Sequence, residues 1–85
     1  MKTYPDLSKS IGIVVDSLRK ERKMTKTALA VYANLEECYV RGIIKGRRNP
    51  TIFVMQALCE ALGVSVGEFF GMVDDEMRQK EEMSI

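Results

Sequence analysis

The chain has 85 residues, of which 46% are hydrophobic and 29% charged, and it contains no histidine. A chain of this length can bury one small core, and no apolar run approaches the roughly 20 residues needed to cross a bilayer. Without histidine, a glycine-rich phosphate loop or a cluster of metal ligands, it is not expected to be an enzyme or to hold a cofactor or a metal ion. We therefore expect a single compact binding module.

The formal net charge of +1 conceals a basic and an acidic region. Residues 19–48 carry nine Lys and Arg against three Glu, a net charge of +6, whereas residues 49–85 carry two basic against seven acidic residues, a net charge of −5. This division favours a protein that presents one face to phosphates and turns the other away. Part of the acidic region could equally be a solvated tail.

The two cysteines, Cys38 and Cys59, both fall in predicted helices, without a further thiol or any histidine to help hold zinc. Neither a disulfide framework nor a structural metal site is therefore expected. The N-terminal segment lacks the long apolar stretch of a signal peptide. These features together favour the reducing cytoplasm as the location of the protein.

Helical spacing of apolar residues predicts a first helix from about Ser8 or Ser10 to Arg22, capped by a serine near its start. A second helix is predicted to begin at Thr25, whose hydroxyl can accept a hydrogen bond from an early backbone N–H. Asn34 tolerates the left-handed conformation, so it can end this helix and let the next one leave at a steep angle.

A third helix is predicted from about Glu36 to Lys45. Its inward positions are Leu35, Val40, Ile43 and, less clearly, Ile44. The opposite, outward stripe consists of Glu37, Cys38, Arg41 and Lys45. This outward stripe is the candidate surface for contacts with a binding partner.

Gly46 is predicted to end the third helix, and Pro50 forbids its continuation. Thr51 can cap a fourth helix that stops at Gly63. Its apolar positions recur at helical spacing and are Ile52, Met55, Leu58, Cys59 and Leu62.

Ser65 and Glu68 have the spacing of a capping box, which predicts the start of a fifth helix. Beyond Asp74 the sequence becomes charged and is expected to fray. The apolar positions of this helix are Val66, Phe69, Phe70, Val73 and Met77. The sequence thus predicts an all-α fold of five helices in one domain over residues 1–85, with a core over about 8–73 and a charged tail over about 74–85.

From Ile11 to Phe70 the chain resembles the Cro and phage-repressor type of helix-turn-helix domain, also called the xenobiotic response element family. The residues that carry the resemblance are Ile11-Gly12, Val15, Leu18-Arg19, Thr25, Leu29-Ala30, Tyr39-Val40, Gly46, Arg48-Asn49-Pro50 and Ala61-Leu62-Gly63-Val64. The part from Tyr39 to Thr51 is particularly similar to the controller proteins of restriction and modification systems. The resemblance implies a lambda-repressor-like fold whose second and third helices form the helix-turn-helix. It also implies a homodimeric transcriptional regulator, a repressor or autoregulator, that binds an inverted repeat in double-stranded DNA.

The resemblance implies that Lys26 faces a phosphate or a base, and that four residues occupy positions where relatives touch base edges. These four are Glu37, Cys38, Tyr39 and Gly42. The chemistry of the side chains independently favours Arg41 for a bidentate contact with guanine. It favours Lys45, Arg47 and Arg48 for contacts with phosphates. The full set of predicted DNA contacts is Thr25, Lys26, Thr27, Glu37, Cys38, Tyr39, Arg41, Gly42, Lys45, Arg47, Arg48 and Asn49.

Two departures from the family pattern change these expectations. Lys26 stands where relatives usually have glutamine, so contact with a phosphate is its expected role. Ile44 replaces a glutamate that in relatives pairs with an arginine at the position of Arg19. Arg19 is therefore expected to face solvent or DNA.

Several outward residues have a plain structural interpretation beside the functional one. Glu37 and Arg41 have the spacing of an ordinary surface ion pair. Cys38 is either a thiol switch or a small filler, and Gly42 either admits close approach to DNA or weakens the helix. Carboxylates at Glu36 and Glu37 repel phosphates, which either sharpens discrimination or means that DNA binding has been lost.

The fifth predicted helix also carries the residues expected to mediate assembly. Phe69, Phe70, Val73 and Met77 extend the apolar character of the fifth helix beyond what a core of this length can readily cover, and they are predicted to form a homodimer interface. The alternative function is a helix-turn-helix module that binds a protein partner, as an antirepressor or an antitoxin, with weak or no DNA binding.

Overall fold

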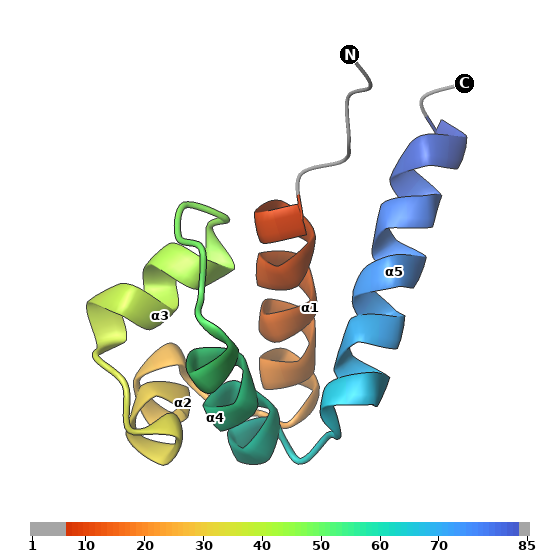
Figure 1. Cartoon of the computed structure of the whole chain (residues 1–85). Helices are drawn as coiled ribbons and strands as arrows, with labels where there is room; N and C mark the ends of the chain where they lie inside the picture. The colour runs from red at the N-terminus through yellow and green to blue at the C-terminus, as the bar shows by residue number, and fades with distance from the viewer. Residues whose placement is uncertain (1–6, 84–85) are drawn as a thin grey trace.

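A computed structural model describes residues 7–83 of the chain, with the surroundings of side chains described for residues 7–79. Within this range the regular secondary structure is helical throughout, as the sequence predicts (Figure 1). The five helices are α1 (Leu7–Glu21), α2 (Lys26–Ala33), α3 (Glu37–Ile44), α4 (Ile52–Leu62) and α5 (Val66–Met83).

The predicted turn at the end of α2 is confirmed. The Thr25 hydroxyl accepts a hydrogen bond from the backbone N–H of Ala28 at 2.9 Å, which caps the start of α2. Asn34 adopts the left-handed conformation, with φ 57° and ψ 47°. Because the backbone reverses its curvature at this residue, the chain leaves α2 and enters α3 after a short connection.

The boundaries of α4 and α5 also follow local signals. Thr51 accepts a hydrogen bond from Val54 N at 3.2 Å, and Gly63 ends α4 with a φ of 72°. In the capping box, Glu68 N donates to the Ser65 hydroxyl at 3.0 Å and Ser65 N donates to the Glu68 carboxylate at 3.1 Å. These are short-range interactions, which explains why the sequence predicts them.

The predicted serine cap of α1 and the predicted fraying of α5 are wrong. The helix α1 already includes Leu7, so Ser8 and Ser10 lie inside it and do not cap it. The helix α5 does not fray at Asp74 but continues to Met83. The Asp74 carboxylate pairs with Arg78 one turn later at 2.6 Å, and such pairs stabilise a helix by about 0.2–0.5 kcal/mol.

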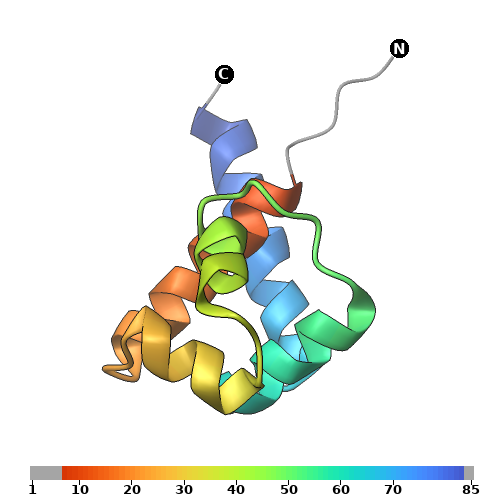
Figure 2. The ribbon, with the colours of Figure 1, turned by 90° about the vertical axis from the view of Figure 1, so that its left-hand side faces the viewer.

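One hydrophobic core receives side chains from all five helices. The helix α1 lies between α3 and α5, so that α3 and α5 occupy opposite sides of it (Figures 1 and 2). Gly12 permits the close packing of α1 on α3, because a Cβ atom at this position would collide with the carbonyl oxygens of Ile43 and Ile44. The end of α3 is thereby fixed against α1 while its outer side remains open.

In the described range, no single helix is both long and apolar enough to cross a membrane. The helix α4 and residues 66–79 of α5 reach that length and composition only as a pair bent by 98°.

Candidate nucleic-acid interface

The outward stripe of α3 is positioned by the residues that alternate with it. Val40 and Ile43 are fully buried in the core, and Leu35 packs against it. The opposite side of α3 therefore faces solvent, as predicted, and Figure 2 shows this helix on the near side of the molecule. Arg41 and Lys45 are exposed there.

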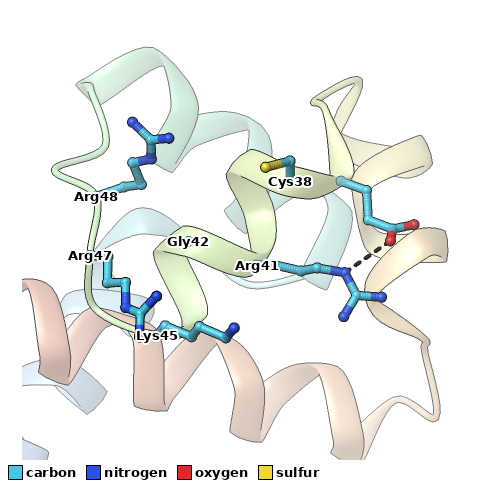
Figure 3. A pocket seen from close by; sticks show the side chains of 7 residues that line it. Cys38, Arg41, Gly42, Lys45, Arg47 and Arg48 are labelled. Atoms are coloured by element: carbon cyan, nitrogen blue, oxygen red, sulfur yellow. Dashed lines mark hydrogen bonds and ion pairs between the residues drawn. The ribbon is translucent and has the colours of Figure 1, made fainter.

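The outward stripe and the segment that follows α3 form one surface hollow, which we call the α3 hollow. It is lined by Glu37, Cys38, Arg41, Gly42, Lys45, Arg47 and Arg48 (Figure 3). All seven belong to the predicted contact set. Four of them carry positive charge, so the hollow attracts anions.

The connection after α3 brings its basic residues back to that helix. Gly46 has a φ of 75°, a conformation that glycine adopts without strain, and Arg47 N donates to the Gly42 carbonyl at 2.9 Å. The side chain of Arg48 then passes close over Gly42, where a Cβ atom would lie 2.8 Å from Arg48 Cγ. Gly42 thus makes room for an arginine of this same chain, a role that neither sequence-based interpretation of this glycine included.

Glu37 is held from two helices. Its Oε2 atom accepts a hydrogen bond from Arg41 Nε at 2.9 Å, which is the predicted surface ion pair (Figure 3). Its Oε1 atom accepts a hydrogen bond from the hydroxyl of Thr27, in the first turn of α2. The hydrogen bond from Thr27, followed by that from Arg41, lowers the pKa of the Glu37 carboxyl below its usual value.

The remaining predicted contacts lie outside the α3 hollow. Thr25 caps α2, and Lys26 is half-buried at the start of that helix. Tyr39 is half-buried against the core. Asn49 is exposed, and its Oδ1 atom accepts a hydrogen bond from the Ser8 hydroxyl at 2.5 Å, which ties the loop after α3 to α1.

Arg19 does not face solvent or DNA, contrary to the expectation. Its side chain is 13% exposed, pairs with Asp16 at 2.6 Å and donates to the Met24 carbonyl at 2.7 Å. Burial disfavours the charged form of Asp16, but hydrogen bonds from Arg19 and Lys20 outweigh burial and lower the pKa of this carboxyl. Since α1 itself supplies a carboxylate, Arg19 needs no partner at the position of Ile44.

The predicted interface on α5 needs correction at two of its four residues. Phe69 and Val73 are buried within the single chain, so they belong to its core and are not free to contact another molecule. Phe70 and Met77 are half-buried against the same core. The core therefore covers more of α5 than the length of the chain suggested.

The most exposed large apolar side chains lie at the start of α4. Ile52 is 87% and Phe53 is 84% exposed. Helical spacing places Ile52 among the apolar positions of this helix, because it lies three residues before Met55. The first turn of α4 instead extends past the edge of the core, which a periodic pattern does not reveal.

Comparison with known proteins agrees with this geometry. Residues 15–69 match a family model described as helix-turn-helix. The chain is 36% identical over 75 residues to the immunity repressor protein of Bacillus phage phi105, in an alignment that covers 88% of this chain and 50% of that protein. The chain thus spans about half the length of the phage repressor.

Two further relatives match over most of their own length. The HTH-type transcriptional regulator y4dJ of Sinorhizobium fredii is 31% identical over 70 residues, which cover 82% of this chain and 91% of the regulator. The restriction-modification controller protein C.Esp1396I, solved as a tetramer with its natural 35 base-pair operator, has a TM-score of 0.79 and 34% identity over 84% of this chain and 93% of that chain.

The family match covers more than half of the 85 residues, and the described structure has five helices with a left-handed turn between α2 and α3. The chain therefore belongs to the helix-turn-helix family of transcriptional regulators, in its Cro and phage-repressor branch, the xenobiotic response element type.

Proposed function

We propose that this protein is a sequence-specific regulator of transcription that reads the major groove of double-stranded DNA with α3. The observation that carries the proposal is the α3 hollow, where Arg41 and Lys45 of the outward stripe meet the two arginines that follow α3. An exposed helix of this kind, flanked by cations, has the shape and charge to enter a major groove.

The geometry suggests a division of roles among the cations. Arg41 is at the middle of the outward stripe, where a guanidinium can pair bidentately with guanine. Lys45, Arg47 and Arg48 are exposed at the end of α3 and in the following segment, where they suit phosphates. Lys26, at the start of α2, is proposed to contact a phosphate as well.

The names of the relatives support repression or autoregulation through an inverted repeat. One relative is an immunity repressor, and another is a controller protein solved with its operator. Because one short helix covers few base pairs, a two-fold pair of α3 helices on half-sites about one helical turn apart would supply the specificity needed in a genome.

We also propose that the working species is a homodimer and that its contact surface includes Ile52 and Phe53. These side chains lie in the first turn of α4, and they are the two most exposed large apolar side chains of the described residues. Two large apolar side chains exposed side by side are best explained by a contact that covers them. Phe53→Glu should reduce dimer formation in sedimentation and weaken binding to a full operator, with helical content unchanged. A wild-type chain that is monomeric at tens of micromolar would contradict the dimer.

Binding to duplex DNA tests the proposed function. Retention of the protein on immobilised random duplex DNA should fall steeply as the salt concentration rises. Selection of binding sites from a pool of randomised duplexes should yield an inverted repeat. Arg41→Ala should cost about 1–3 kcal/mol on the selected site and relax the preference at one base pair per half-site. A chain with little salt-dependent retention and no selected site would instead be the protein-binding module that Glu36 and Glu37 also suggest.

A further inference from the structure

The carboxylate of Glu37 connects the two helices of the helix-turn-helix through two different oxygen atoms. Its Oε1 atom accepts from the Thr27 hydroxyl of α2, and its Oε2 atom accepts from Arg41 Nε of α3. An ordinary ion pair between residues four apart leaves both side chains free to move and contributes about 0.2–0.5 kcal/mol. Here a third residue, Thr27 of α2, also binds the Glu37 carboxylate. This contact restricts the movement of the group that holds Arg41.

This arrangement limits how Arg41 can meet a base. A guanidinium has five N–H donors, one on Nε and four on the two Nη atoms. A side-on pair with guanine would need Nε, which Glu37 already occupies. The end-on pair uses both Nη atoms, for which the structure records no partner among the described residues, on a side chain that is 47% exposed.

We propose that Glu37 is a positioning residue that holds Arg41 end-on toward a guanine and thereby sets the sequence preference of the protein. This inference rests on the proposed function, because it concerns the same DNA-reading site. An arginine already held in its binding orientation loses less conformational freedom when DNA binds. The negative charge of Glu37 also disfavours the neighbouring phosphates, which directs Arg41 to a base rather than to the backbone.

Glu36 provides a matched control. It precedes Glu37 directly, is exposed, and makes no side-chain capping hydrogen bond to α3. Glu36→Ala and Glu37→Ala therefore remove the same charge from the same end of α3, but only the second removes the contact with Arg41. The two variants separate the effect of charge from the effect of orientation.

The experiment measures the binding of full-length variants to the selected operator, to operators altered at the guanine, and to random duplex. Glu37→Ala should lower the preference for guanine about tenfold, within the roughly 5- to 150-fold range that a bidentate pair provides. It should also raise affinity for random duplex. Glu36→Ala should raise that affinity as well but leave the preference unchanged.

A double variant shows whether Glu37 affects the guanine preference through Arg41 or through its own contact with DNA. In an Arg41→Ala background, Glu37→Ala should cause no further loss of guanine preference, since the arginine it positions is absent. Independent, additive losses would mean that Glu37 contacts DNA itself, and would overturn the positioning role. Thr27→Val should reduce the guanine preference, as Glu37→Ala does. The separate variant Thr27→Ser keeps the hydroxyl and should therefore keep the guanine preference of the wild type.

The outcomes for the two proposals are distinct. If the wild-type chain shows no sequence preference, the proposed function fails. If the wild-type chain prefers guanine and Glu37→Ala retains the full preference, the proposed function stands and the positioning role is wrong.

Discussion

Replacing Gly42 with alanine should strengthen the fold and weaken DNA binding at the same time. Gly42 lies within α3, where alanine is favoured over glycine by about 1 kcal/mol. The new Cβ would lie 2.8 Å from Cγ and 3.3 Å from Nε of Arg48, so this side chain must move. Because Arg48 is exposed, it can rotate away from α3 at modest cost. We expect a net gain in stability of about 0.5 kcal/mol.

The loss of binding follows from the displaced charge. A contact with one phosphate changes the slope of log affinity against log salt by about 0.9. At 0.1 M salt this corresponds to a loss of about eightfold in affinity, shared by all DNA sequences. Arg48→Ala should produce the same two changes in affinity and slope, because it removes the same cation.

Urea unfolding and fluorescence anisotropy at several salt concentrations provide the two measurements. A lower stability for Gly42→Ala would show that Arg48 does not move aside, which refutes the steric argument. The double variant with Arg48→Ala is the decisive control, since Gly42→Ala should then have no further effect on affinity. A further loss there would mean that the methyl group meets the DNA itself.

Three other predictions concern stability. Gly12→Ala should cost about 2 kcal/mol in urea unfolding, because its Cβ meets rigid backbone carbonyls, whereas Gly71→Ala, whose Cβ meets no atom within 4 Å, should stabilise the chain by about 0.5–1 kcal/mol. Phe69→Ala should cost about 3–5 kcal/mol in the same assay, and a cost near zero would show that this ring is not in the core. Asp16→Asn should cost about 1 kcal/mol at pH 7. Since the native pKa of this carboxyl is lowered from its ordinary value of 3.8, its stabilisation is present above that value and is lost as the pH falls through the native pKa. The unfolding free energies of Asp16→Asn and wild type should therefore converge in acid, and a constant difference would contradict the ion pair with Arg19.

The amino-acid sequence by itself determined the features that depend on neighbouring residues. Thr25 and Thr51 cap helices because a hydroxyl reaches the backbone N–H three residues later. Asn34 and Gly63 end helices because these residue types accept a left-handed backbone. The outward stripe of α3 follows in the same way from the helical repeat, and all seven residues of the α3 hollow could be predicted from the sequence. The five-helix fold follows from the same local signals, whereas the family was indicated by the resemblance of residues 11–70 to known repressors.

Only the tertiary structure decided which apolar and charged side chains meet across helices. Phe69 is buried and Phe53 is exposed, although both are aromatic residues in amphipathic helices, because burial depends on where each helix crosses its neighbours. Thr27 reaches Glu37 across the turn, a contact that no spacing within one helix predicts. Such contacts depend on the distances and angles between helices, and these are set by the packing of the whole core rather than by any local run of residues.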